Sequence, residues 1–74
     1  MQISQHQLIT LDFELKHEYK EEENNSMITV YVKDELEIEF TNKVCTSICF
    51  NGYELEGITS FRGLEKFIQL VYGS

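Results

Sequence analysis

The chain has 74 residues, of which 42% are hydrophobic, and its 13 acidic and 6 basic side chains give a net charge of −7. A chain of this length has a small core, so we expect residues 1–74 to fold as a single small domain. The negative charge argues against nonspecific binding to nucleic acid or to an anionic membrane, because both need a basic surface. It is compatible with a basic protein partner, with cations, or with solubility alone.

Several features of the chain predict a cytoplasmic protein. The N-terminal segment MQISQHQLIT lacks the basic and apolar regions of a signal peptide. No apolar run approaches the ~20 residues that span a bilayer, so we expect no association with a membrane. The cysteines, Cys45 and Cys49, are too few for a disulfide-stabilised scaffold.

Residues 8–17 are predicted to form the first strand. Apolar side chains occupy every second position of this stretch: Ile9, Leu11, Phe13 and Leu15. A period of two is typical of a half-buried strand. The polar and acidic stretch that follows, HEYKEEENNS over residues 17–26, is predicted to be a loop.

The next two strands are predicted to form a β-hairpin around residues 33–35. The first of them, MITVYV, is rich in β-branched and aromatic residues. A three-residue loop would pair Val32 with Leu36, whereas a two-residue turn would pair Lys33 with Leu36 and place unlike residues on one face. Because the buried residues fix the register, we favour the longer loop. The two strands are then residues 27–32 and 36–40.

Two further strands are predicted beyond a turn at residues 41–43, where Asn42 tolerates positive φ. Val44, Thr46, Ile48 and Phe50 would face the core from residues 44–50. Asn51-Gly52 is the preferred dipeptide of a two-residue hairpin turn, and it would pair Phe50 with Tyr53. The last strand is residues 53–56.

From residue 59 onward the apolar spacing is that of a helix. Thr59 or Ser60 can cap its start, and Gly73 can end it. Its apolar stripe is Phe61, Leu64, Phe67, Ile68, Val71 and Tyr72. The expected fold is therefore α+β: an antiparallel β-meander of four to five strands with one C-terminal helix packed on the apolar face.

The opposite face of the sheet is the candidate partner-binding surface. In the predicted register it gathers carboxylates from several strands, with the ring of Tyr31 as an anchor among them. Cys45, Ser47 and Cys49 would lie between these side chains. The candidate residues are Asp12, Glu14, Tyr31, Glu37, Glu39, Glu54 and Glu56. The alternative is that these carboxylates only keep the protein soluble and protect the sheet edges.

Other chemistry is not indicated by the sequence. Cys45 and Cys49 would lie about 13 Å apart on one strand, too far to share a zinc ion or to form a disulfide. His6 and His17 have no serine or cysteine partner in a known catalytic pattern, and no glycine-rich phosphate loop is present. We therefore expect no metal, no cofactor and no enzymatic activity.

The stretch GITSFRGLEKFIQL, residues 57–70, resembles the last strand–helix junction of the single-stranded-DNA-binding transcriptional coactivator family. The resemblance covers about a fifth of the chain, and it implies a curved four-stranded sheet, a C-terminal helix and a dimeric assembly. Members of that family bind through a basic, aromatic sheet face, and here that face is acidic. We therefore apply the resemblance to topology alone and do not assign the chain to the family.

The leading hypothesis is a non-enzymatic protein whose acidic face occupies a basic groove built for nucleic acid. In type, though not in sequence, it resembles the small phage-encoded inhibitors of restriction, repair or CRISPR nucleases. A second hypothesis is a structural or oligomerisation module, such as a homodimer, whose acidity is only solubilising. A third is a binder of single-stranded nucleic acid that uses another surface, although no direct contact with nucleic acid is expected under the first.

Overall fold

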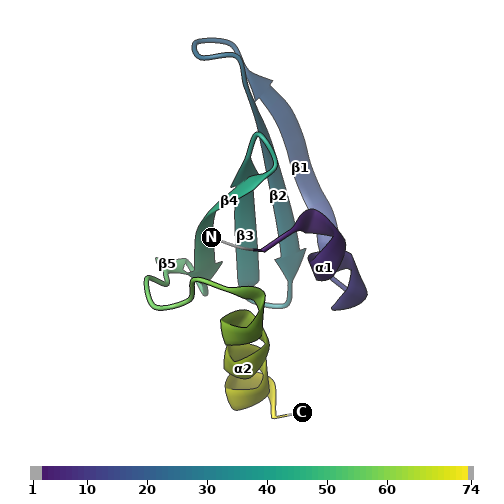
Figure 1. Cartoon of the computed structure of the whole chain (residues 1–74), viewed down its shortest axis with the longest axis vertical. Coiled ribbons are helices and arrows are strands. Elements are labelled where there is room, and N and C mark those ends of the chain that lie inside the picture. Colours follow the sequence, from purple (N-terminus) through teal and green to yellow (C-terminus); the bar gives the residue numbers. More distant parts are fainter. Residues whose placement is uncertain (1–2, 74) are drawn as a thin grey trace.

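The computed structural model describes residues 3–73 and contains a five-stranded antiparallel sheet and two helices (Figure 1). The strands lie in chain order across the sheet, which is a meander, and a helix follows the last strand. The predicted α+β class is confirmed. The elements are α1 (Gln5–Thr10), β1 (Glu14–Glu21), β2 (Ser26–Lys33), β3 (Leu36–Thr41), β4 (Val44–Phe50), β5 (Tyr53–Glu54) and α2 (Phe61–Tyr72).

The N-terminal segment starts with a helix, so the prediction of a strand over residues 8–17 is wrong in its first half. The Ser4 hydroxyl accepts a hydrogen bond from the Gln7 N–H at 3.2 Å, and the Gln7 side chain accepts one from the Ser4 N–H at 3.0 Å. This reciprocal capping box fixes the start of α1. Leu8 is buried in the core and Ile9 is 56% exposed, which reverses the predicted strand's placement of Ile9 on the apolar face.

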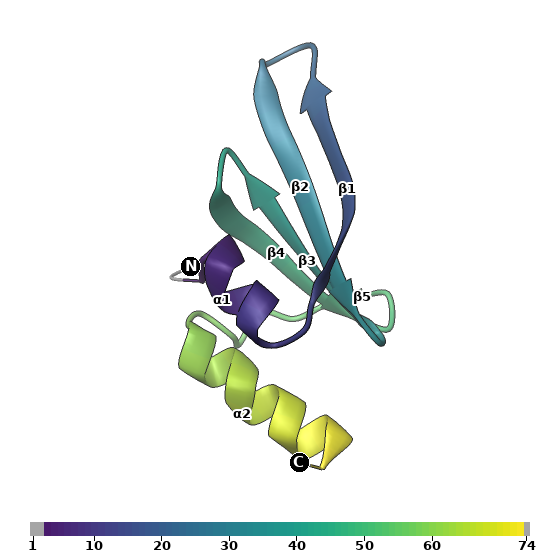
Figure 2. The ribbon, with the colours of Figure 1, turned by 90° about the vertical axis from the view of Figure 1, so that its right-hand side faces the viewer.

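The acidic stretch predicted as a loop is largely strand. β1 continues to Glu21 and pairs with β2 as far as Ser26, so only residues 22–25 form the turn. This hairpin projects beyond β3 and β4 and accounts for much of the 40 Å length of the molecule (Figure 2). β1 is an edge strand, and every one of its residues is exposed.

The β2–β3 connection is a two-residue turn, Asp34-Glu35, and the predicted three-residue loop is wrong. Lys33 pairs with Leu36, the pairing that the hydrophobic pattern disfavours. Lys33 tolerates the inner face because it lies at the end of the sheet, where its stem is half-buried. Its Nζ donates to the Leu11 carbonyl at 2.6 Å, so the ammonium group keeps a polar partner.

The shorter turn reverses the faces of β2 relative to the prediction. Tyr31 lies in the core, 8% exposed, with its ring edge-on to that of Phe40 at a centroid distance of 5.9 Å. Val30 and Val32 lie on the opposite face, in register with Glu39 and Glu37 of β3. We call the core side the inner face and this opposite side the outer face.

β3 alternates as predicted, with its apolar side chains on the inner face and its glutamates on the outer face. Leu36, Ile38 and Phe40 are fully buried, and Glu37 and Glu39 are partly exposed. The period of two identified this strand correctly because β3 is paired on both sides and its own side chains alternate without interruption between the two faces.

β4 contains a bulge that changes the orientation of its first half. Phe40 pairs with Cys45 whereas Glu39 pairs with Ser47, so Thr46 is the extra residue. Cys45 is therefore buried on the inner face and Val44 is 56% exposed. The predicted outward position of Cys45 and inward position of Val44 are both wrong.

The second half of β4, the β4–β5 turn and the ends of α2 follow the prediction, but β5 ends at Glu54, so the predicted strand over residues 53–56 is too long by two residues. Asn51 and Gly52 have φ of 54° and 87°, and Phe50 pairs with Tyr53 across the two-residue turn. Ser60 caps α2 by accepting from the Gly63 N–H at 3.2 Å. Gly73 ends the helix in the left-handed conformation with φ of 75°.

The core lies between the inner face and both helices. α2 lies beyond one end of the sheet, at the bottom of Figures 1 and 2, with Leu64 fully buried and Phe67 edge-on to Phe50 at 5.3 Å. The N-terminal segment covers more of the inner face through Leu8 and Phe13. No helix among residues 3–73 has both the length and the apolar character needed to cross a membrane.

Candidate acidic interface

The outer face carries carboxylates from three of the five strands, β1, β3 and β5. One row across the sheet runs from Glu14 through Val32, Glu37 and Cys49 to Glu54. The next row contains His17, Val30, Glu39 and Ser47. The Ser47 hydroxyl donates to Glu54 Oε1 at 3.5 Å, a contact that ties the short strand β5 to this surface.

The carboxylate surface continues past the ends of the strands. Asp34 and Glu35 of the β2–β3 turn line a shallow depression of about 420 Å³ together with Glu37. Asp12 and Glu14 line a neighbouring depression of about 330 Å³, which Asp34 also borders. We call this surface the acidic face: Asp12, Glu14, Asp34, Glu35, Glu37, Glu39 and Glu54.

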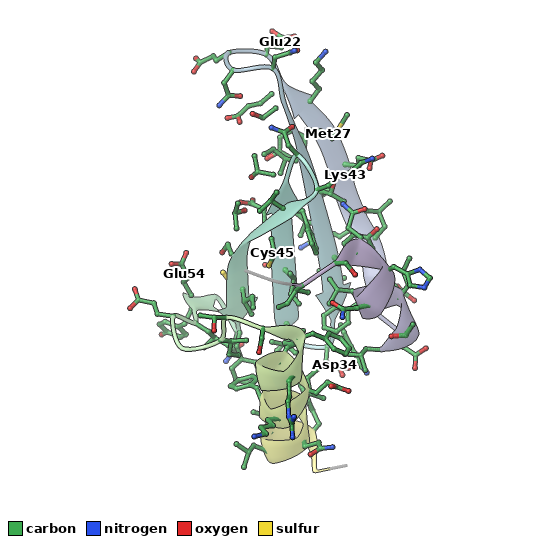
Figure 3. The ribbon with its side chains drawn as sticks, in the orientation of Figure 1. Glu22, Met27, Asp34, Lys43, Cys45 and Glu54 are labelled. Carbon is green, nitrogen blue, oxygen red and sulfur yellow. The ribbon has the colours of Figure 1, made fainter. Side chains whose placement is uncertain are left out.

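Most of the predicted partner-binding residues belong to this surface. Glu14, Glu37, Glu39 and Glu54 lie on the strands of the outer face, and Asp12 borders it from the turn after α1, where its φ is 66°. Figure 3 shows Asp34 and Glu54 near the same end of the sheet, with Glu22 at the opposite end of the molecule.

Two of the predicted residues lie elsewhere. Tyr31 is buried against Phe40, so its assignment to the exposed face is wrong, and the two-residue turn is the physical reason. Glu56 is exposed, but it lies in the loop after β5 and not on the strands of the outer face. It borders a different hollow, next to Phe67 of α2.

The sequence reasoning missed an aromatic residue and a cation on the same face. Tyr19 pairs with Ile28 in a third row of the outer face and is 52% exposed. Lys16 is the extra residue of a bulge in β1, and its Nζ lies 2.7 Å from Glu37 Oε1. The predicted strand ends at residue 17, which places Lys16 near its end and Tyr19 in the predicted loop, whereas β1 continues to Glu21. The alternation of His17, Tyr19 and Glu21 was the signal for a strand continuing there.

The electrostatic balance of the acidic face remains negative. The contact between Lys16 and Glu37 is the one ion pair found among residues 3–73, and both side chains are nearly half exposed. Such a pair contributes at most about 1 kcal/mol and is weakened by salt. No other carboxylate of the face pairs with a cation among the described residues, although Glu35 and Glu54 each accept a hydrogen bond from a hydroxyl group.

The centre of the outer face contains a small apolar patch, Val30 and Cys49, among charged and polar side chains. These two side chains line a depression of about 320 Å³ whose other lining residues are Lys16, His17, Glu37, Glu39 and Ser47. A patch in which aliphatic groups lie between charged ones is suited to protein contact, because the apolar centre can be desolvated while the charged rim sets the orientation.

The two cysteines lie on opposite sides of the sheet. Cys45 is buried on the inner face, where burial raises the pKa of its thiol, and Cys49 lies half-buried on the outer face. Within residues 3–73, no three side chains of His, Cys, Asp or Glu come together in a group that could hold a metal ion. The geometry offers carboxylates for salt bridges rather than for coordination.

Comparison with known proteins adds no relative. No protein-family model matches the chain, and neither curated protein sequences nor solved structures contain a significant match to it.

Proposed function

We propose that this chain is a non-enzymatic, cytoplasmic binding protein whose acidic face docks against a basic protein surface. The observation that supports the proposal is the gathering of carboxylates on one side of the sheet, with a single ion pair to Lys16 among the described residues. In its most specific form, the face imitates nucleic acid and inhibits a nuclease or another nucleic-acid-binding protein, as phage anti-CRISPR proteins do.

Charge and shape together support this proposal. Neighbouring strands lie about 4.8 Å apart, so carboxylates on adjacent or alternate strands fall at spacings that Lys and Arg side chains can match. An acidic surface on a protein of net charge −7 attracts a basic partner over a Debye length and speeds association at low salt. Tyr19 provides the exposed ring that Tyr31 does not.

The proposal is tested by capture from a cell lysate on the immobilised protein. We expect basic proteins to be retained at about 0.05 M NaCl and lost at about 0.5 M, because added salt screens the contacts. Duplex DNA added at low salt should release them, whereas neutral dextran should not. If DNA does not release the retained proteins, nucleic-acid mimicry is contradicted, whereas the broader proposal of a basic protein partner is not.

Charge-neutral variants locate the surface. Replacing the four strand glutamates by glutamine, Glu14→Gln, Glu37→Gln, Glu39→Gln and Glu54→Gln, should abolish capture. The matched control changes four glutamates of the second half of β1 and the β1–β2 turn: Glu18→Gln, Glu21→Gln, Glu22→Gln and Glu23→Gln. The same loss of capture in both variants would mean that net charge, and not the acidic face, is responsible.

A second candidate function is self-association through α2. Leu70 is 85% exposed and Val71 41% exposed, so part of the apolar surface of the helix has no cover within one chain. In this case the acidity is only solubilising. Light scattering of the pure protein at increasing concentration distinguishes the two: a dimer that Leu70→Glu dissociates favours the module, and a monomer at all concentrations excludes it.

A further inference from the structure

A hollow separate from the outer face lies between the β5–α2 loop and α2. It has a volume of about 430 Å³ and is lined by residues 54–58 together with Phe67. Leu55, Ile58 and Phe67 supply its apolar wall, and Gly57 leaves one side without a side chain. Leu70, one turn beyond Phe67 on α2, extends the apolar surface into solvent.

The walls of this hollow are held in place by the core. Ile58 is buried, and the Phe67 ring rests edge-on against Phe50 at 5.3 Å. The Leu55 N–H donates to the Ile48 carbonyl at 2.7 Å, which anchors the loop to β4. The hollow is therefore built by fixed elements, as is usual for a binding pocket.

Its rim is acidic, and it adjoins the acidic face. Glu54 and Glu56 border the hollow, and no Lys, Arg or His is among the residues that line it. Glu54 also belongs to the acidic face, where it accepts from Ser47. A partner lying on the acidic face therefore reaches the hollow by crossing the two-residue strand β5.

We propose that this hollow receives a large apolar side chain of the partner, flanked on the partner by lysine or arginine that pairs with Glu54 and Glu56. The inference rests on the proposed function, because it takes the partner to be basic, and it adds the anchor that fixes register. Charged groups alone orient a partner, whereas a buried apolar anchor at the centre of a contact carries much of the affinity.

The test uses short peptides and NMR spectra of the ¹⁵N-labelled protein. The probe is the peptide Lys-Lys-Trp-Lys-Lys, compared with Lys-Lys-Gly-Lys-Lys and Glu-Glu-Trp-Glu-Glu. We expect the first to shift the amide signals of Gly57, Ile58 and Phe67 and to bind about tenfold more tightly than the second. The acidic peptide should not shift these signals.

A variant that fills the hollow checks the location. A Cβ added at Gly57 meets no atom within 4 Å, and the residue has no positive φ, so Gly57→Phe is compatible with the fold. It should reduce the affinity for Lys-Lys-Trp-Lys-Lys to that for the glycine peptide. Thr59→Phe is the matched control, since Thr59 is exposed and does not line the hollow, and it should bind as the unmodified protein does.

Several outcomes overturn the inference. Equal binding of the tryptophan and glycine peptides, with shifts confined to Glu37 and Glu39, removes the anchor and leaves the basic partner intact. Equal affinity for Glu-Glu-Trp-Glu-Glu would show that the hollow does not require a basic partner. Unchanged affinity of Glu56→Gln for Lys-Lys-Trp-Lys-Lys would show the same. Glu56→Gln also provides the test of location if Gly57→Phe fails to fold. If no peptide binds, the inference that the hollow receives an apolar side chain is wrong. The proposed function is then tested separately by capture from a lysate.

Discussion

At the scale of single residues, a few polar side chains connect elements that are distant in the chain. The Tyr72 hydroxyl donates to Glu35 Oε2 at 2.6 Å and accepts from the Glu35 N–H at 3.3 Å, which ties the end of α2 to the β2–β3 turn. Lys33 likewise holds the segment after α1 by its bond to the Leu11 carbonyl. These bonds lie around the edge of the core, where the apolar contacts of a small domain are fewest.

The Tyr72 contact makes stability depend on pH in a defined direction. Burial and the hydrogen bond to Glu35 raise the pKa of Tyr72 above its usual 10.0. A raised pKa means that the folded chain holds the proton more tightly, so this stabilisation is complete below pH 10 and is lost as the pH rises through the folded-state value. Tyr72→Phe should lower the free energy of unfolding by about 1 kcal/mol at about pH 8, as measured in urea.

Above about pH 10, the free energy of unfolding of Tyr72→Phe should fall less with increasing pH than that of the unmodified protein. Tyr53→Phe is the control, because Tyr53 is 76% exposed and should change neither quantity. Identical pH profiles for the Tyr72 variant and the unmodified protein would show that the contact with Glu35 does not stabilise the fold.

At the scale of the elements, tight turns decide which side of each strand faces the core. The β3–β4 turn consists of Asn42 and Lys43, with φ of 51° and 69°, so the predicted positive φ of Asn42 is confirmed and the turn is shorter than predicted. Asn42 Oδ1 also accepts from the Met27 N–H at 2.9 Å, which fastens this turn to β2. For Lys43, the left-handed conformation brings the Cβ close to the backbone, which costs free energy.

We expect Lys43→Gly to stabilise the protein. Glycine adopts positive φ without the Cβ clash, so the free energy of unfolding should rise by about 1 kcal/mol, and the turn then matches Asn51-Gly52. Thermal or urea unfolding measures the change. Lys43→Ala removes the same charge but keeps the Cβ, and it should not stabilise. Equal stabilisation by both variants would indicate a charge effect in place of a backbone effect.

At the scale of the whole molecule, negative charge is spread over an elongated body of 40 × 22 × 21 Å. The acidic face covers one side of the sheet, and Glu21, Glu22 and Glu23 lie at the end of the β1–β2 hairpin. With a net charge of −7, mutual repulsion should exceed the gain from the single ion pair found in the described part of the chain, Lys16–Glu37.

The stability of the protein should therefore rise with ionic strength. Between about 0.01 M and about 0.5 M NaCl, we expect the urea midpoint to increase, because the Debye length falls from ~30 Å to a few ångströms. The variant with glutamine at the four strand positions of the acidic face should respond less. A fall in the midpoint with salt would mean that attractive pairs such as Lys16–Glu37 dominate the electrostatics.

The sequence by itself determined those parts of the fold that depend on local chemistry. Asn51-Gly52 specified its turn because few other residues adopt two successive positive φ values. Ser60 and Gly73 set the ends of α2 through their own cap geometry. The alternation of apolar and acidic residues predicted β3 and placed Glu37 and Glu39 on the outer face. The spacing of Ser4 and Gln7 also fits a capping box, but the alternating pattern of residues 8–17 favoured a strand there.

Only the tertiary structure decided which face of β2 lies in the core, and with it the position of Tyr31. Both faces of MITVYV are apolar enough to be buried, so periodicity alone cannot choose between them. The choice came from the two-residue turn and from Phe40, whose ring packs against Tyr31. The bulge at Thr46 had the same effect on Cys45. The physical reason is that a one-residue change in pairing reverses every side chain of a strand, and the free energy of that change depends on neighbours far away in the chain.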